Sequence, residues 1–419
     1  MKKIFLLALT AATLVTMTGC TNKPKEEGFA PKLDTETACS LTIRGHYENF
    51  EALVAEINSF KEYYPNVKIT YEYDKNHKKN ILTALTGDTP PDIFFSYSTL
   101  DYGTLAEYTE DLSDKDLGID LSCIRDALIY RDSEGHVPYV PIFTISFGML
   151  INEDLFAKHN VKIPSTYNEL VNACATFSQA DPKIYPMLGH ESMVLYPLYF
   201  PYFCAQIKDN QAAIDALNNK SEGAGEYMRS SLELADGFMK TGYVDKDACL
   251  SIADDYDKTI KRFYEGDVAM MLAKASTVSG TEKRESQSEA FTNNPFKYSF
   301  APVPSTDKGG YFYNTVDLCF SVNKKSENLD MANEFMRFLV STKELNNMSK
   351  AKRMISPCKD LSFDNIYSEF GKIDASRVFT PSQLGLSDAA DIQVRKAGTA
   401  VCLKDMSVDD AVANYGKFE

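Results

Sequence analysis

The chain has 419 residues, a formal net charge of −15 and a hydrophobic content of 44%. This composition excludes an intrinsically disordered chain, and the acidic balance excludes nucleic acid and anionic lipid as electrostatic partners. The length exceeds what one hydrophobic core usually holds, so two lobes are expected.

The first twenty residues have the parts of an export signal. Lys2 and Lys3 give a positive start, residues 4–17 are apolar and uncharged, and Gly19-Cys20 follows closely. The stretch resembles bacterial lipoprotein signals, although Met17 stands where Leu is usual. The resemblance implies that residues 1–19 are removed and that Cys20 carries diacylglycerol. The alternative is an ordinary secretory signal with an incidental cysteine. No other stretch is apolar and long enough to cross a bilayer.

The next hundred residues alternate between strand and helix patterns. Residues 21–37 are polar, and we expect a flexible tether over residues 20–37. Alternating or wholly apolar runs then predict strands, and apolar residues at helical spacing predict helices between them. The expected strands cover residues 41–45, 67–73 and 93–95, and the helices cover 50–60 and 80–85. A β-α-β-α-β order predicts a largely parallel sheet covered by helices.

The rest of the chain continues this mixture. A long extended segment is expected over residues 139–151, and Thr166 with Glu169 matches a capping box before a helix over residues 167–177. Strands are predicted at 268–272 and 316–322, and a helix at 332–339. Residues 360–419 have a mostly helical pattern with turns.

Eight cysteines follow Cys20, and none forms a CxxC pair. Several lie in apolar runs, which favours buried free thiols, although an even number in an exported chain leaves disulfides open. We expect no zinc or other metal site, because Cys and His do not cluster, and no cofactor. The eight are Cys39, Cys123, Cys174, Cys204, Cys249, Cys319, Cys358 and Cys402.

Six segments resemble, in order, the extracellular solute-binding proteins of ATP-driven (ABC) importers, in the large family that contains many sugar and oligosaccharide binders. In PSTYNEL, Tyr167 replaces the Trp that is usual in that family. The segments are FKEYYPNV (60–67), GDTPPDI (87–93), VP to NEDLF (140–156), PSTYNEL (164–170), FYEGDVAM (263–270), and PVP (302–304) with VNK to Phe335 (322–335). Most of these residues also have structural explanations, since Gly87 ends a helix and Pro90-Pro91 favours an extended chain.

The resemblance implies a two-lobed α/β fold of the periplasmic-binding-protein kind (type II-like). Each lobe is expected to hold a mainly parallel sheet flanked by helices, and a hinge joins the lobes. The expected first lobe comprises residues 38–145 and 302–339, and the second comprises residues 146–301 and 340–419. The implied function is that of a monomeric receptor, lipid-anchored on the extracellular face, that captures a small solute by hinge closure and delivers it to an ABC permease. A sugar or short oligosaccharide is the expected solute.

The family's ligand contacts map onto loops beyond the strand ends. Tyr97, Tyr196 and Tyr313 are suited to stacking on sugar rings, and Asp101, Glu191 and Asn314 to bonding hydroxyl groups. Lys274 and Ser276 are suited to a carboxylate or phosphate instead. The chain has no Trp, which argues against large oligosaccharides. The full set of expected ligand-binding residues is His46, Tyr47, Ser96, Tyr97, Asp101, Thr144, Glu191, Tyr196, Lys274, Ser276, Tyr313 and Asn314.

Two other functions are weighed against transport. A glycoside hydrolase needs two carboxylates across one bond, and acidic pairs in this chain lie in acidic surface stretches. The five His are isolated, and there is no Gly-x-Ser-x-Gly or His-Glu-x-x-His motif, so we do not expect an enzyme. A sensing or adhesion module with the same fold and a non-sugar ligand stays open from the sequence alone.

Overall fold

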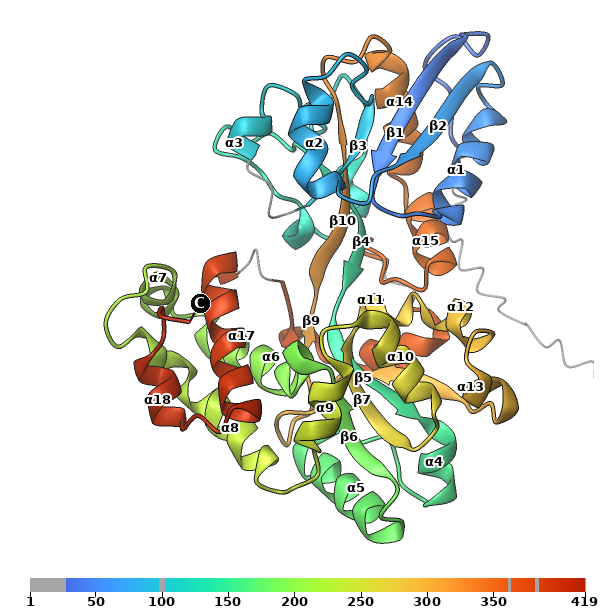
Figure 1. The fold of residues 1–419 in the computed structure, drawn as a ribbon. Coiled ribbons are helices and arrows are strands. Elements are labelled where there is room, and N and C mark those ends of the chain that lie inside the picture. Colours follow the sequence, from blue (N-terminus) through green and yellow to red (C-terminus); the bar gives the residue numbers. More distant parts are fainter. Residues whose placement is uncertain (1–27, 98–101, 361–362, 381–383, 419) are drawn as a thin grey trace, which may run out of the picture.

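A computed structural model describes residues 28–97, 102–360, 363–380 and 384–418. It has an upper and a lower lobe joined by long strands (Figure 1). The upper, first lobe holds a five-stranded sheet in the order β2-β1-β3-β10-β4. These strands are β1 (Cys39–Gly45), β2 (Val67–Tyr73), β3 (Ile93–Ser96), β4 (Val140–Ile145) and β10 (Thr315–Val322).

Helices cover both faces of the first sheet. On one face, α1 (Glu51–Lys61) lies against α14 (Leu329–Leu339), and the rings of Phe60 and Phe335 meet at 5.2 Å. On the other face, α2 (His77–Leu85) and α3 (Tyr102–Leu105) bury a smaller apolar cluster that includes Phe94. Burial on both faces explains why β3 reads as a continuous apolar run.

The second lobe is built on a four-stranded sheet in the order β6-β7-β5-β8. Thr166 caps α5 through the predicted capping box, because its hydroxyl accepts from the Glu169 backbone N and the Glu169 carboxylate accepts from the Thr166 backbone N. The strands are β5 (Phe147–Asn152), β6 (Tyr185–Gly189), β7 (Val268–Lys274) and β8 (Tyr298–Ala301). The helices beside them are α4 (Glu153–Lys158), α5 (Tyr167–Ala180), α9 (Lys246–Ile252), α10 (Tyr256–Tyr264), α11 (Ala275–Val278), α12 (Thr281–Glu285) and α13 (Glu289–Asn293).

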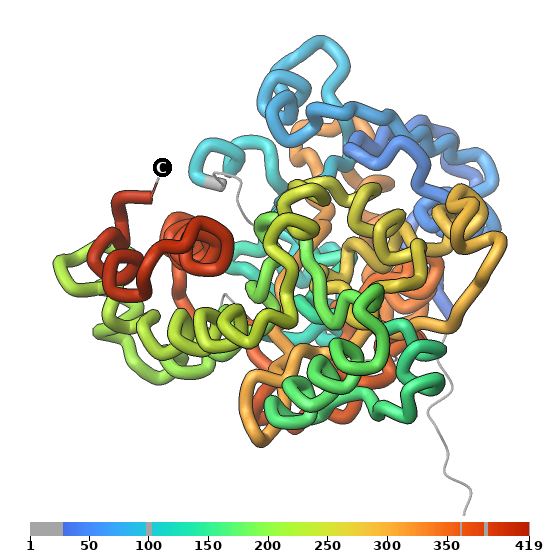
Figure 2. The backbone as a smooth tube through the Cα atoms, turned by 60° about the horizontal axis from the view of Figure 1, so that its bottom comes forward, coloured from blue at the N-terminus to red at the C-terminus, as the bar shows by residue number. Residues whose placement is uncertain are grey.

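A helical bundle extends the second lobe. The C-terminal helices lie beside the α7–α8 segment on one side of the molecule (Figure 2). The helices are α6 (Tyr196–Ile207), α7 (Gln211–Asn218), α8 (Arg229–Met239), α17 (Asp388–Leu403) and α18 (Val408–Ala413). Side chains of α6 and α17 share a pocket with residues of the first lobe.

Three segments cross between the lobes. The predicted extended segment is two strands, β4 and β5, separated by Ser146, and β10 crosses beside β4. A third crossing follows α15 (Thr342–Ala351), where Ile355 pairs with Thr144. The small pair β9 (Phe312–Tyr313) and β11 (Val378–Phe379) lies at the lower end of β10.

The two-lobed α/β fold expected from the sequence is confirmed, with a difference in strand direction. In the first lobe β1, β2 and β3 are parallel, as predicted, but β10 runs antiparallel to its neighbours. In the second lobe only β6 and β7 are parallel. The physical reason is that β10 and β5 enter their sheets from the hinge side, so they run opposite to the strands of the β-α-β units.

Two segments lie elsewhere than the expected lobe boundaries place them. α15 packs on α1 and β4, so residues 342–351 belong with the first lobe. Around residue 306 the chain bonds to the second lobe, because the backbone N of Tyr167 donates to the Thr306 carbonyl. Each segment packs on the lobe whose surface its apolar side chains cover. The spacing of residues along the chain does not reveal which lobe that is.

The expected tether is shorter than predicted. Phe29 packs edge-on against Tyr63 and Phe338, with ring centroids 5.1 and 5.3 Å apart. The Arg337 guanidinium lies 4.3 Å from the Phe29 ring centroid and donates to the Ala30 carbonyl at 2.6 Å. The chain is therefore bound to the first lobe from Phe29 onward. Cys20 and the leader lie outside the described residues.

The eight cysteines after Cys20 are free thiols, and six of them are buried. Within the described ranges, no three His, Cys, Asp or Glu side chains are grouped as a metal site would require. In the same part of the chain, no helix combines the length and the apolarity needed to span a bilayer.

Candidate ligand-binding cleft

A pocket of about 370 Å³ lies between the two lobes. The first lobe contributes the segment before β4, the hinge contributes the lower end of β10, and the second lobe contributes β5, α6 and α17. The lining residues are Leu128, Tyr130, Tyr139, Phe147, Tyr196, Tyr313, Asn314, Thr315, Val316, Thr380, Gly385, Leu386, Asp388 and Asp391.

Aromatic rings form two walls of this pocket. Tyr130 and Tyr139 stack in the first lobe with their ring centroids 5.5 Å apart and their planes 3° from parallel. On the other side Phe147 stacks on Tyr313 at 5.6 Å and meets the edge of Tyr196 at 4.8 Å. Flat apolar faces of this kind suit the CH face of a sugar ring.

Hydrogen-bond acceptors complete the pocket. The Tyr196 hydroxyl donates to Asp391 Oδ1 at 2.6 Å, and burial raises the pKa of Asp391. Asn314 is 1% exposed, and its Nδ2 donates to the Ile145 carbonyl at 3.1 Å. The Asn314 Oδ1 is buried without a hydrogen-bond partner in the described part of the chain. An unpaired buried acceptor costs about 1–3 kcal/mol, which a donor on a ligand offsets.

Local helix chemistry places the two carboxylates. The Ser387 hydroxyl accepts from the Ala390 backbone N at 3.2 Å and so begins α17 at Asp388. Asp388 and Asp391 therefore lie on the first turn, where the helix dipole favours negative charge. Figure 1 shows α17 beside α6 with this end directed toward the upper lobe.

A second group of polar side chains gathers around Asp317 on β10. Burial raises the pKa of Asp317, while Lys274 of the second lobe and a hydrogen bond from Tyr47 of the first lobe oppose that shift. Nearby, Tyr97 and His46 Nδ1 are hydrogen-bonded at 2.6 Å. Burial and the neighbouring His77 lower the pKa of His46 to about 4, so its imidazole is neutral at physiological pH.

The sequence matches the family described as bacterial extracellular solute-binding protein over residues 43–345. The chain belongs to this family. No curated protein matches the chain as a relative.

Several solved structures of low sequence identity share the fold of this solute-binding protein. RafE from Streptococcus pneumoniae, without ligand, has a TM-score of 0.70 and 16% identity, and the match covers 91% of this chain and 98% of RafE. RafE in complex with raffinose gives a TM-score of 0.67 at 16% identity, over 91% of this chain and 100% of RafE. A sugar transporter protein from Bacillus licheniformis in complex with stachyose gives 0.61 at 19% identity, over 91% and 100% of the two chains.

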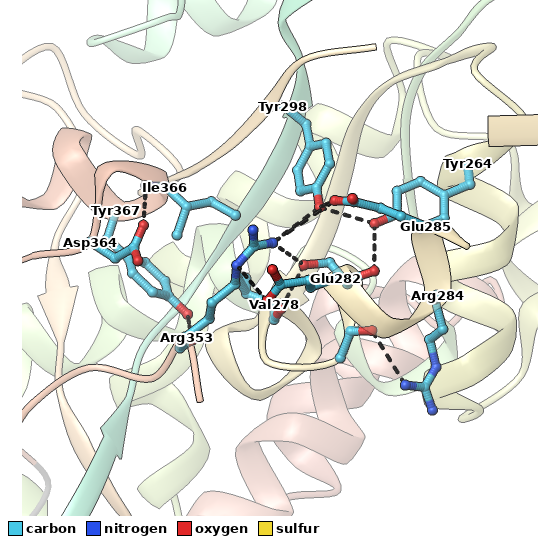
Figure 3. A network of polar contacts seen from close by, with 12 residues as sticks. Tyr264, Val278, Glu282, Arg284, Glu285, Tyr298, Arg353, Asp364, Ile366 and Tyr367 are labelled. Carbon is cyan, nitrogen blue, oxygen red and sulfur yellow. Dashed lines mark hydrogen bonds and ion pairs between the residues drawn. The ribbon is translucent and has the colours of Figure 1, made fainter. Parts of the chain in front are cut away.

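A polar network holds the third crossing of the solute-binding protein against its second lobe (Figure 3). Arg353 Nη1 donates to Thr281 Oγ1 at 3.1 Å and to the Tyr298 hydroxyl at 3.4 Å. Tyr298 in turn donates to Glu285 Oε1 at 2.5 Å, and the Tyr367 hydroxyl donates to the Arg353 carbonyl at 2.7 Å. The network fixes the segment whose Ile355 pairs with the hinge strand.

The structure separates the predicted site residues into groups. Tyr196, Tyr313 and Asn314 line the pocket, as expected for cleft residues. His46, Tyr47, Tyr97 and Lys274 lie around Asp317, and the half-buried Ser276 follows Lys274 on α11. These positions agree with a cleft location, and their contact with a ligand stays a prediction.

Three of the expected residues lie in other places. Ser96 and Thr144 are fully buried, with the Ser96 hydroxyl bonded to Ser321 Oγ at 2.6 Å and the Thr144 hydroxyl to the Ile355 carbonyl at 3.1 Å. Their hydroxyls support the sheet and the hinge, because they point between strands. Glu191 lines a separate pocket beside Asp254. Asp101 lies outside the described residues.

Sequence reasoning missed Tyr130, Tyr139, Asp317, Asp388 and Asp391. Acidic residues in a first helical turn are common, so Asp388 and Asp391 have no distinctive pattern. Tyr139 has a weak signal, since it stands directly before the hinge-crossing strand. Asp317 has a clearer one, because it interrupts the apolar strand over residues 316–322 with a charge.

Proposed function

We propose that this protein is a receptor for a sugar or short oligosaccharide, held on the extracellular face of the membrane by lipid on Cys20, that delivers its ligand to an ABC permease. The observation that carries the proposal is the pocket between the lobes, with aromatic rings from both lobes and acceptors beside them. Its volume falls in the usual range for small-molecule sites. The raffinose and stachyose complexes of structures with this fold support a sugar over other solutes.

Binding by hinge closure follows from the placement of these contacts. A ligand that touches Tyr130 and Tyr139 above and Tyr196 and Asp391 below gains most contacts when the lobes approach. The closed form is therefore favoured by the ligand's differential affinity for it. A closed receptor is also the form that a permease distinguishes from an empty one.

An enzyme is not proposed for this site. A glycoside hydrolase places its two carboxyl groups on either side of the scissile bond. The two carboxylates of the pocket, Asp388 and Asp391, both lie on the first turn of α17. A ligand in the pocket meets both from the same side, which suits binding of hydroxyl groups.

The test is ligand binding with raffinose, stachyose and cellotriose as probes. We expect at least one of them to raise the melting temperature and reduce the radius of gyration in X-ray scattering. At a concentration of about 100 times Kd, the stabilisation is about 2.7 kcal/mol. If none of these sugars produces either change, the proposed sugar receptor is rejected.

Two matched variants localise the binding to the pocket. Tyr130 and Tyr227 are tyrosines of similar exposure, 40% and 38%, but only Tyr130 lines the pocket. Loss of one stacked ring costs about 0.5–1.5 kcal/mol, which is roughly a two- to tenfold increase in Kd. We expect Tyr130→Ala to weaken sugar binding by about this factor and Tyr227→Ala to leave it unchanged. Equal effects of the two changes would place the site elsewhere.

A further inference from the structure

The pocket between the lobes has a marked charge asymmetry. Two of its lining residues are acids, Asp388 and Asp391, and within the described part of the chain no Lys, Arg or His lines it. A pocket for an anionic solute would have the opposite pattern, with cationic donors facing the ligand. The lining therefore selects against phosphorylated or carboxylated sugars.

Neither acid is neutralised by an internal partner. No Lys, Arg or His nitrogen among the described residues lies within 4.0 Å of the Asp388 or Asp391 carboxylate. Arg395, one helical turn beyond Asp391, favours the ionised form of Asp391, but the effect of burial is larger. Asp391 has the Tyr196 hydroxyl as a donor, and a hydroxyl carries no charge. The two carboxyl groups thus have no basic side chain as an ion-pair partner among the described residues.

Asn314 adds a third hydrogen-bond acceptor to the lining of the pocket. Asn314 Nδ2 donates to the Ile145 carbonyl, whereas Asn314 Oδ1 has no hydrogen-bond partner among the described residues. Asn314 is 1% exposed and lines the pocket, so water has little access to this oxygen. A hydrogen-bond donor on a ligand that reaches this oxygen would offset the cost of its burial.

The aromatic walls of the pocket also favour a positively charged group. The faces of aromatic rings are negative, and a cation placed over them gains about 0.5–2 kcal/mol. Tyr130, Tyr139 and Tyr313 line the pocket together with the two acids. Rings, carboxylates and an amide oxygen all attract a positively charged donor, and an ammonium group is such a donor.

We propose that the ligand carries a protonated amine, as an amino sugar or an amine-bearing polyol does, and that Asp388, Asp391 and Asn314 Oδ1 receive it. This inference rests on the proposed function, because it names the charge class of the solute that the cleft captures. The other polar group of the cleft, around Asp317 and Lys274, contains both signs of charge and has no such preference.

The experiment compares ligands that differ only in charge. The β-1,4-linked glucosamine trimer and cellotriose share a backbone, with an ammonium group in one where the other has a hydroxyl. Glucosamine and glucose form a second pair, and a galacturonate trimer is the anionic probe. The measurement is calorimetry at mildly acidic pH, where the amines are protonated. In at least one pair the amine should bind at least tenfold more tightly than its neutral counterpart, and the galacturonate trimer should not bind.

Asp391→Asn tests the assignment to these residues. Asparagine keeps an oxygen that accepts the Tyr196 hydroxyl, and its melting temperature reports whether the variant folds. We expect the ratio of the amine and hydroxyl affinities to fall toward one. Asp330→Asn is the control, since Asp330 is an exposed acid in the first turn of α14 and its loss changes the net charge equally. This control should keep the full ratio.

Each other outcome overturns the inference. Cellotriose or raffinose binding as tightly as any amine rejects the charge preference but leaves the sugar receptor standing. Tighter binding of the galacturonate trimer rejects it as well and moves the ligand contact to Lys274. An amine preference that Asp330→Asn lowers as much as Asp391→Asn assigns the effect to long-range charge. If no amine and no neutral sugar binds, the inference and the proposed function both fail.

Discussion

The carboxyl group of Glu56 lies buried between α1 and α15, beside the carboxyl group of Glu344. Glu56 is 4% exposed, and its Oε2 has no hydrogen-bond partner in the described part of the chain. Burial, the hydrogen bond with Glu344 and the charge of Glu344 all raise the pKa of Glu56, whereas Lys343 lowers it. A carboxyl–carboxyl hydrogen bond requires one shared proton, so this interface is most stable while Glu56 is protonated.

This arrangement predicts a pH-dependent gain in stability for Glu56→Gln. A raised folded-state pKa means that the stability contributed by the proton is present below the ordinary pKa of Glu and is lost as pH rises through the raised value. Glutamine cannot ionise and still donates to Glu344. The melting temperature of Glu56→Gln should therefore match that of the unchanged protein in acid and exceed it increasingly toward alkaline pH.

Glu62→Gln is the control for this prediction, because Glu62 is exposed at the end of the same helix. Its melting curve should follow that of the unchanged protein at every pH. A difference for Glu56→Gln that does not vary with pH would contradict the shared proton.

At the scale of elements, the packing of α17 on α6 decides where Asp388 and Asp391 lie. Gly398 permits the close approach, since a Cβ at this position would be 2.0 Å from the Tyr199 hydroxyl oxygen. Tyr199 is buried at this contact, next to Tyr196 on the same helix. The glycine therefore positions one wall of the pocket although it lies about two to three helical turns from Asp391 and Asp388 along α17.

We predict opposite effects of adding a methyl group at two helical glycines. Gly398→Ala forces α17 and α6 apart and should destabilise by about 1–3 kcal/mol, from which improved helix propensity recovers less than about 1 kcal/mol. Gly237 lies in α8, and nothing stands within 4 Å of a Cβ placed there. Gly237→Ala should stabilise by about 0.5–1 kcal/mol. Urea unfolding measures both.

The same pair tests the link to function. Gly398→Ala should also weaken binding of whichever sugar binds the unchanged protein, because it displaces Asp391, and Gly237→Ala should not. Unchanged stability and binding in Gly398→Ala would show that α17 does not depend on this contact.

For the whole molecule, the position where the chain joins the first lobe limits how far the fold can lie from Cys20. The chain is held from Phe29 by Tyr63, Phe338 and Arg337. From Cys20 to Phe29 the backbone spans at most about 30 Å when fully extended. If Cys20 carries lipid, the first lobe stays close to the membrane, and the second lobe is free to move during closure.

The anchor is tested by Cys20→Ser. This change removes the sulfur that lipid would modify, so the protein should move from the membrane fraction to the medium, as measured by fractionation and immunoblotting. Cys39→Ser makes the same chemical change at the first residue of β1 and should leave the protein in the membrane fraction. Retention of the Cys20→Ser protein on membranes would contradict lipid anchoring.

Local periodicity predicted much of the fold in the first hundred residues. There, β1, α1, β2, α2 and β3 follow one another, and each buries its apolar face against its neighbours in the chain. The capping box at Thr166 was likewise predictable, because its two partners are three residues apart. The antiparallel strands of the second lobe were not, since their partners lie far apart along the chain, as Met149 and Leu272 do.

The residues of the candidate site were likewise predictable only in part. Tyr196, Tyr313 and Asn314 were found through the positions that the family uses for its cleft, and they line the pocket. Ser96 and Thr144 stand at positions that the family also uses for its cleft, but their hydroxyls are hydrogen-bonded to Ser321 and to the Ile355 carbonyl. Which way a side chain points from a hinge strand depends on bulges such as those between Val316 and Cys319 in β10, and these depend on pairing with β4.

The sequence by itself predicted an export signal. It also determined that the chain is acidic and globular and that its order of elements and its motifs are those of an extracellular solute-binding protein. These properties are local: each depends on composition or on residues within about one helix or strand of one another. Only the tertiary structure decided which residues form the cleft. Tyr139 and Asp391 stand about 250 residues apart in the printed sequence, and they share a pocket because β4, β10 and the packing of α17 on α6 bring the two lobes' surfaces together.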